Sequence, residues 1–223
     1  MRFKAFAIDC AGALSGLLGI IALGEAAQAH PHVWVTVETE LLHDENKSIT
    51  GFQHRWTFDE LYSEFATQGL DKNGDGVLDR DELKDLAKLN VDSMAEFGFF
   101  TFAHFDGNEL ARLPARDYWL EYQDKMLILQ LTLPLKNPVP WARLEDFNFS
   151  VYDPTFYVGF ELARKDPVRL QAGLGECRAV LSRPEVQTPV QSLSQSVQSS
   201  NDALLQPGGQ YAQTVRLKCR PGS

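Results

Sequence analysis

HVWVTVETELLHDENKSITGFQHRWTF, residues 32–58, predicts a β-hairpin around which the rest of the chain can be arranged. Valines alternate with polar residues in its first part, which is the pattern of a strand with one buried face. DENKS, residues 44–48, supplies turn residues, and ITGFQHRWTF, residues 49–58, follows as a second strand. We therefore expect these two strands to be antiparallel neighbours.

The spacing of apolar residues changes at Thr57, which is followed three residues later by a glutamate. This capping-box pattern predicts a helix from Thr57 to about Leu70. The same pattern recurs at Asp79 and predicts a second helix with one apolar face, which Gly98 ends. Residues 57–98 are thus predicted to form a helical insertion between two strands.

Short segments of alternating aromatic and polar residues, separated by turns, follow the insertion. Short turns favour antiparallel pairing of neighbouring strands. The sequence therefore predicts an α+β fold, a mostly antiparallel β-sheet or sandwich with the helix-loop-helix inserted between its second and third strands. The predicted later strands contain FFTFAHF, DYWLEY, MLILQLTLPL, FNFSVYD, TFYVGFEL and the C-terminal YAQTVRLKC.

Residues 1–29 have the pattern of a signal peptide. A basic start precedes the apolar residues 11–23, and the small residues of Ala-Gln-Ala at 27–29 form a cleavage site. The mature chain would begin at His30 and form a single periplasmic domain over residues 30–223. We expect this domain not to be inserted directly in the membrane after cleavage.

Cleavage leaves two cysteines, Cys177 and Cys219. In an oxidising compartment we expect them to form a disulfide that tethers the C-terminal strand, although two unrelated free thiols are the alternative. The disulfide would close a loop that contains residues 183–210, a Ser/Gln/Pro-rich segment with little to bury, which is predicted to be flexible.

The formal net charge of the chain is −9. The predicted cleavage removes as many acidic as basic residues, so the mature protein keeps this charge. A strongly acidic surface repels nucleic acid and anionic membranes and attracts cations. We therefore expect no nucleic-acid partner, and cations as ligands.

DKNGDGVLDRDE, residues 71–82, matches the calcium-binding loop of an EF-hand position by position. Calcium prefers six to eight oxygen ligands, and Gly76 occupies the position of the required sharp turn. Because the chain contains no second loop of this kind, we expect Ca²⁺ to have a structural role; the alternative is an acidic helix-turn-helix that binds no ion. The predicted ligands are Asp71, Asn73, Asp75, the Val77 carbonyl, Asp79 and Glu82.

Three histidines form a candidate transition-metal site. The predicted hairpin places His32 and His54 on neighbouring strands, and His30 would add its ring and the new terminal amine. Imidazole nitrogens that converge in this way bind Zn²⁺, Ni²⁺ or Cu²⁺, and Glu38 or Glu121 could complete the site. In the alternative interpretation His54 is a hydrogen-bonded core residue and His30 belongs to a frayed end.

Several blocks, in order, resemble the periplasmic family called domain of unknown function 1007. They are AHPHVWV after the signal peptide, HRWTFDELYSEFA, GLDKNGDGVLDRDELKDLA, VYDPTFYVGFEL and the late cysteines, and they span nearly the whole mature chain. Members are commonly described as periplasmic components of an uncharacterised ABC-type transport system, often encoded beside nickel/cobalt-type permeases. The resemblance implies transition-metal handling, with His30, His32, His54 and Trp56 at the metal region.

Together these features predict a periplasmic metal-binding accessory protein that delivers Zn²⁺ or Ni²⁺/Co²⁺ to an inner-membrane metal permease and holds Ca²⁺ structurally. The alternative is a calcium-stabilised structural or interaction module without a transition-metal site. The mature chain has no nucleophile elbow, no free thiol once the disulfide forms and no phosphate-binding glycine loop, so we expect it not to be an enzyme. Copper chemistry at an amino-terminal histidine is the remaining enzymatic alternative.

Overall fold

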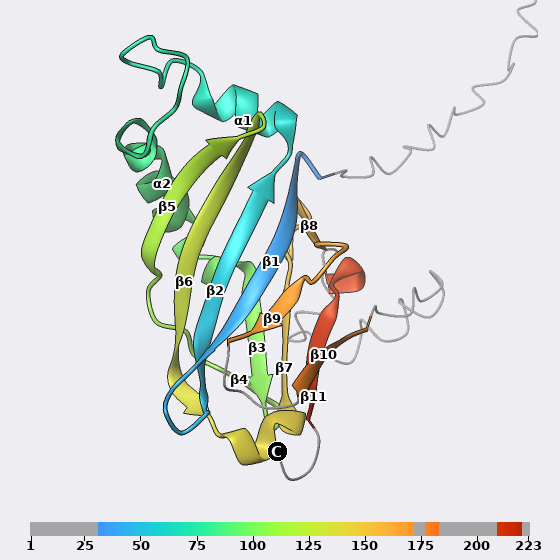
Figure 1. The fold of residues 1–223 in the computed structure, drawn as a ribbon. Helices are drawn as coiled ribbons and strands as arrows, with labels where there is room; N and C mark the ends of the chain where they lie inside the picture. The colour runs from blue at the N-terminus through green and yellow to red at the C-terminus, as the bar shows by residue number, and fades with distance from the viewer. Residues whose placement is uncertain (1–30, 172–176, 183–208, 220–223) are drawn as a thin grey trace, which may run out of the picture.

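The computed structural model describes residues 31–171, 177–182 and 209–219. These residues form two β-sheets around a shared core, with a helical insertion at one end of the first sheet (Figure 1). The predicted signal peptide, His30 and residues 183–208 of the predicted flexible loop lie outside the described residues. No helix within the described ranges is long and apolar enough to cross a membrane.

The first sheet contains the predicted hairpin at its centre. Its strands run in the order β5-β6-β2-β1-β8, and β9 also pairs with β1. Most of these pairs are antiparallel, as the sequence predicts. The strands are β1 Val33–His43, β2 Ile49–Phe58, β5 Arg116–Gln123, β6 Met126–Val139, β8 Val158–Leu162 and β9 Val168–Leu170.

The second sheet has the order β10-β11-β7-β3-β4, and its pairs are antiparallel. Its strands come from the middle and the C-terminal part of the chain (Figure 1). They are β3 Thr101–Phe105, β4 Asn108–Glu109, β7 Phe147–Val151, β10 Cys177–Ser182 and β11 Thr214–Cys219.

Strand β1 is paired on both of its edges. On one side it forms the predicted antiparallel hairpin with β2, in which Val35 lies opposite Phe58 and Thr39 opposite His54. On the other side it pairs in parallel with β8 and β9, which differs from a purely antiparallel sheet. The difference arises because the chain crosses from β7 in one sheet to β8 in the other, so β8 does not reach β1 through a hairpin turn.

Helix α1, Glu60–Thr67, begins later than the sequence predicts. Thr57 still belongs to β2, where it pairs with both neighbouring strands. Asp59 is the N-cap, and its Oδ1 accepts the Tyr62 amide hydrogen bond at 2.9 Å. The capping pattern at Thr57 is therefore overridden by the sheet, and the insertion begins at Asp59.

Helix α2, Arg80–Ala95, begins where the sequence predicts. Asp79 is its N-cap and accepts from the amides of Asp81 and Glu82, each at 2.9 Å. The Glu82 carboxylate accepts from the Asp79 amide at 3.3 Å, which completes the capping box. The buried face of α2 contains Leu83, Ala87, Val91 and Met94, which join the core.

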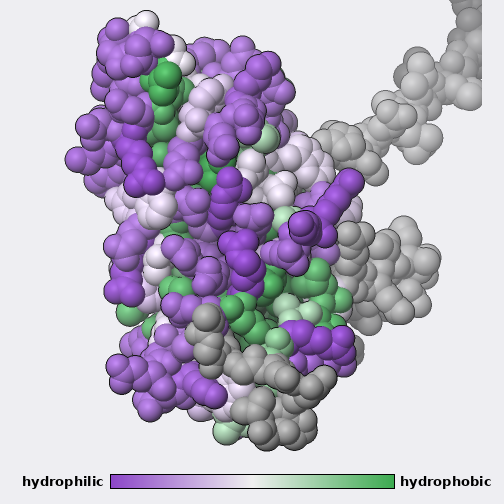
Figure 2. All heavy atoms as spheres, in the orientation of Figure 1, coloured by the Kyte–Doolittle hydropathy of each residue, from purple (hydrophilic) through white to green (hydrophobic). Residues whose placement is uncertain are grey.

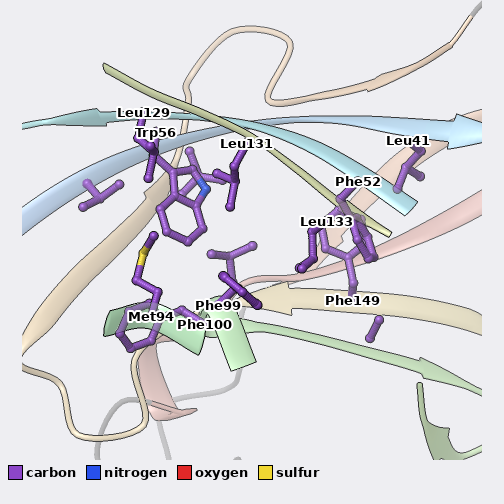
Figure 3. Packing of buried hydrophobic residues seen from close by; sticks show 14 of the residues in the cluster. Leu41, Phe52, Trp56, Met94, Phe99, Phe100, Leu129, Leu131, Leu133 and Phe149 are labelled. Carbon is purple, nitrogen blue, oxygen red and sulfur yellow. The ribbon is translucent and has the colours of Figure 1, made fainter. Parts of the chain in front are cut away.

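The core lies between the two sheets and extends under α2. Phe52 and Trp56 from β2 lie in this core with residues of β6. Phe52 also packs against Phe149 of the second sheet, and the 3-10 helix η1, Gly98–Phe100, adds two aromatic rings (Figure 3). Burial of each such side chain contributes about 1.5–3 kcal/mol to folding. The sheets are thus held together by apolar contacts around the β1–β2 hairpin.

The predicted disulfide joins Cys177 of β10 to Cys219 of β11. The two residues lie directly opposite each other, and their Cα atoms are 4.0 Å apart. The bond closes a segment with a sequence separation of 42 residues, and restricting a loop of this length in the unfolded chain contributes about 4 kcal/mol in the chain-entropy model. The C-terminal strand is therefore fastened to the second sheet.

Candidate metal centre

The loop of residues 71–82 connects α1 to α2 at the end of the molecule that projects beyond the sheets (Figure 1). Hydrophilic side chains cover most of this end, with a narrow hydrophobic strip between them (Figure 2). Gly74 and Gly76 have φ values of +73° and +79°, which L side chains rarely adopt. The glycines at these two positions permit the tight turns that fold the loop back on itself.

Asp71 organises the first half of the loop. Its Oδ1 accepts from the Gly74 amide at 2.7 Å, and its Oδ2 accepts from the Gly76 amide at 3.0 Å. Asn73 and Asp75 make shorter turns of the same kind. The Oδ1 atom of each residue accepts a hydrogen bond from the backbone amide two residues later in the chain, in both cases at 2.8 Å. The side-chain oxygens therefore face inward toward the loop backbone.

Glu82 closes the loop from its other end. One oxygen of its carboxylate, Oε1, accepts from the amides of Lys72 at 2.8 Å and Asn73 at 3.3 Å, while Oε2 accepts from Asp79. Only 9% of Glu82 is exposed, and it is the one charged residue of α2 that is buried in the described structure. The last residue of the loop is thus held against its first residues.

The donor set fits a hard cation. Carboxylate, amide and backbone oxygens are the ligands that Ca²⁺ takes, and the predicted positions supply all three kinds. Within the described ranges, however, no three His, Cys, Asp or Glu side chains are grouped closely enough to hold a metal ion. The loop oxygens instead accept hydrogen bonds from the amides of the same loop, so an ion would have to replace some of these bonds.

His54 lies in the core between the two sheets and has no exposed surface. Its Nδ1 is 2.9 Å from the Thr39 hydroxyl of β1, and its Nε2 is 3.2 Å from the Thr101 hydroxyl of β3. Both ring nitrogens are therefore occupied by fixed partners. Desolvation by burial lowers the pKa of His54 to about 3, so the ring is neutral at pH 7.

The structure does not bring His32 and His54 together. His54 lies opposite Thr39 in the hairpin register, and His32 precedes Thr39 by seven positions, roughly 23 Å along an extended strand. His32 is exposed and lies directly before β1, where its amide donates to the Tyr157 carbonyl at 2.8 Å and its ring packs against the Tyr157 ring. His54 therefore has the position of the core histidine in the second interpretation.

The two carboxylates considered as additional ligands also lie apart from His54. Glu38 forms an ion pair with Arg55 at 3.5 Å on the hairpin surface. The Glu121 Oε1 accepts from the Arg80 guanidinium at 3.0 Å and from the Trp119 indole at 2.6 Å. Neither carboxylate belongs to a metal-binding cluster within the described residues.

Sequence reasoning missed the two threonines that hold His54. One signal was present, because the buried face of β1 continues from the valines through Thr39 to Leu41, so a polar residue occupies a core position. A buried hydroxyl requires a hydrogen-bonding partner, and His54 on the neighbouring strand provides one. Thr101 comes from the other sheet, and no local pattern predicts its position.

A family model described as "Protein of unknown function (DUF1007)" matches residues 16–219. The chain belongs to this family. An uncharacterized protein of Haemophilus influenzae is similar to it, with 29% identity over 209 residues that cover 91% of this chain and 97% of the relative. The DUF1007 match spans both sheets and the helical insertion, so the loop of residues 71–82 lies inside the matched region. The family resemblance expected from the sequence is confirmed.

Proposed function

We propose that this DUF1007 protein is a periplasmic accessory module in which the loop of residues 71–82 binds Ca²⁺ as an EF-hand and thereby stabilises the helical insertion. The observation that carries the proposal is the position of Glu82. Its buried carboxylate lies against the start of the loop, at Lys72 and Asn73, so the two ends of the ligand set are already adjacent.

The role of the ion is structural in this proposal. Glu82 belongs to α2, which packs on β5 and contributes its apolar face to the core. Asp71 follows α1 by only a few residues. An ion bound by both residues links the two helices, and the acidic surface of the chain raises the local cation concentration. Extracellular calcium modules of this kind bind with dissociation constants of about 10⁻⁴ to 10⁻³ M.

Isothermal titration calorimetry of the mature protein with Ca²⁺ tests the proposal. We expect one site per chain and loss of measurable binding in Glu82→Gln, because that substitution removes the bidentate carboxylate. Glu45→Gln, which changes an exposed acid outside the loop, is the matched control and should leave the site intact. Absence of calcium binding in the wild-type protein, or equal binding by both variants, would contradict the proposal.

Transition-metal delivery to an inner-membrane permease is a second candidate function, as the family resemblance implies. The observation in its favour is that His32 is exposed directly before β1, two residues after the predicted mature terminus at His30. The terminal amine and these two rings are nitrogen donors suited to Zn²⁺, Ni²⁺ or Co²⁺. We propose His54 only as a structural residue, because its ring nitrogens are already hydrogen bonded.

Native mass spectrometry of the mature protein with stoichiometric Zn²⁺ and Ni²⁺ distinguishes the two functions. Under the second candidate the protein holds one transition-metal ion in addition to calcium, and the double variant His30→Ala, His32→Ala loses it. His104→Ala is the control, since His104 lies on β3 of the other sheet. A spectrum with calcium alone leaves the calcium-stabilised module as the function.

A further inference from the structure

A cleft of about 270 Å³ lies between α2 and β5. Ala87 and Leu120, which are both buried, form part of its apolar lining. Tyr118 and Trp119, the two residues before Leu120, also line it. Because consecutive residues of a strand point to opposite faces of a sheet, a cleft lined by all three lies at the edge of β5, which is the edge strand of the first sheet.

Helix α2 adds three cationic side chains to this cleft. Arg80, Lys84 and Lys88 are spaced four residues apart, so they lie on the same side of the helix. Asp85 is the one acidic residue among the lining residues. The lining itself therefore carries more cationic than acidic side chains, in a chain with a net charge of −9.

The three cations differ in their partners. Arg80 forms an ion pair with Glu121, and Lys88 forms one with Asp92. Lys84 has no ion pair with any residue in the described part of the chain. Its ammonium group is therefore available to a ligand that enters the cleft.

Arg80 is fixed in orientation although it is exposed. Its guanidinium carbon lies 4.7 Å from the centre of the Trp119 ring, and Glu121 accepts hydrogen bonds from both residues through the same oxygen. A guanidinium has five N–H donors, of which one bonds Glu121 in this arrangement. Stacking on the ring restricts the side chain, so less conformational entropy is lost when the remaining donors bind an anion.

We propose that this cleft binds a small organic anion, an aromatic carboxylate whose ring contacts the apolar lining and whose carboxylate pairs with Lys84. Cation-lined clefts with apolar floors match amphipathic ligands of this class, and the volume lies just below the range of ordinary ligand pockets, about 300–1,000 Å³. None of the residues that line the cleft is a predicted calcium ligand, although Arg80 belongs to the loop of residues 71–82.

Two matched probes test the inference, indole-3-acetate and its neutral analogue indole-3-acetamide. Each is titrated into ¹⁵N-labelled mature protein while the indole N–H signal of Trp119 and the amide signals of Ala87 and Leu120 are followed by NMR. We expect the carboxylate to shift these signals and to bind about tenfold more tightly than the amide, because a hydrogen bond to a charged group is stronger than a neutral one.

Lys84→Gln supplies the decisive comparison. It should weaken binding of the carboxylate by about three- to tenfold and leave the amide unaffected, because the substitution removes the positive charge and keeps a polar side chain. Lys165→Gln, at another exposed lysine, is the control and should change neither affinity. The inference is overturned if neither probe shifts the cleft signals at about 10 mM, if both bind equally, or if Lys84→Gln behaves like the control.

Discussion

The His54 site and the loop of residues 71–82 satisfy their polar groups in opposite ways. The partners of His54 come from strands of both sheets and are held in place by the surrounding core. The carboxylates of Asp71 and Glu82 are bonded to amides of their own loop, which lies at the end of the molecule. The first arrangement cannot exchange a partner without disturbing the core, whereas the second can exchange backbone amides for an ion.

This difference distinguishes potential metal ligands that stabilise the fold from potential metal ligands that can bind an ion. Histidine and carboxylate are both metal ligands, and the sequence alone predicted metal binding at both places. Residues whose partners come from other strands of the core contribute to the fold, while residues whose partners are amides of their own loop can exchange these hydrogen bonds for an ion. Four experiments test this distinction, and the expected effects decrease from the first to the last.

Truncation of His54 should have the largest effect. His54→Ala leaves a cavity in the core and removes one hydrogen-bond partner from each of two buried hydroxyls, so we expect a loss of about 3–5 kcal/mol in the free energy of unfolding. Chemical denaturation at pH 7 measures this loss. His104→Ala, on β3 but only half-buried, should cost less than about 1 kcal/mol. Equal losses of unfolding free energy in the two variants would contradict a special structural role for His54.

Acidification should reveal the same site. The pKa of His54 is about 3 in the folded protein, against 6.5 in the unfolded chain, so the unfolded state binds the proton first as the pH falls. The contribution of neutral His54 to the free energy of unfolding is fully present above pH 6.5, and it is lost progressively as the pH falls toward 3. Between pH 7 and pH 5 we expect a loss of about 2 kcal/mol from this group.

The pH effect is measured by denaturation of the wild-type protein and His54→Gln at both pH values. Glutamine has no titrating group in this range, so the variant should lack this part of the decrease. The difference between the two decreases isolates His54 from other acids and bases. A variant that loses as much stability as the wild type on acidification would show that another group titrates.

Calcium should have an intermediate effect, confined to the loop. At ten times the dissociation constant, a ligand that binds only the folded state stabilises it by about 1.4 kcal/mol, which raises the melting temperature by about 3–6 °C in a protein of this size. Thermal unfolding with calcium and with a chelator measures the shift. Glu82→Gln should abolish the shift, although it also lowers stability in the chelator because Glu82 holds three backbone amides.

The smallest effect is expected at the N-cap of α2. In the presence of a chelator, Asp79→Ala removes the side chain that accepts two amide hydrogen bonds and should cost about 1 kcal/mol. Asp92→Ala, within the exposed part of the same helix, should cost about 0.5 kcal/mol or less. Circular dichroism during denaturation compares the two variants, and an Asp79 variant as stable as the control would contradict a capping role.

Much of the fold was predictable because its signals are local. The alternation in β1 and β2, the capping box at Asp79 and the pairing of the two mature cysteines each depend on neighbouring residues or on simple counting. The start of α1 was misplaced because the pairing of Thr57 with two strands outweighs its capping propensity. The parallel pairing of β1 with β8 and β9 was missed because it depends on a crossover between sheets.

The candidate sites show the same division. The loop of residues 71–82 is a contiguous motif, so the sequence identifies every predicted ligand without knowledge of the fold. The prediction of a histidine cluster depended on the register of the hairpin. The sequence indicates the two strands but does not determine which residue of β1 lies opposite His54. The cleft between α2 and β5 joins segments that are separated by the whole of η1, β3 and β4, so no spacing rule predicts it.

The parallel partners of β1 determine the order in which this molecule can be completed during synthesis. Val33 at the start of β1 pairs with Val158, and Leu41 near its end pairs with Leu170. In a nascent chain that ends at β7, one edge of β1 has no partner strand, because β8 and β9 have not yet been made. Contacts between residues so far apart in the sequence also form slowly. The protein therefore reaches its folded state only after the chain has been made as far as β9, so the pairing of β1 is completed late in synthesis.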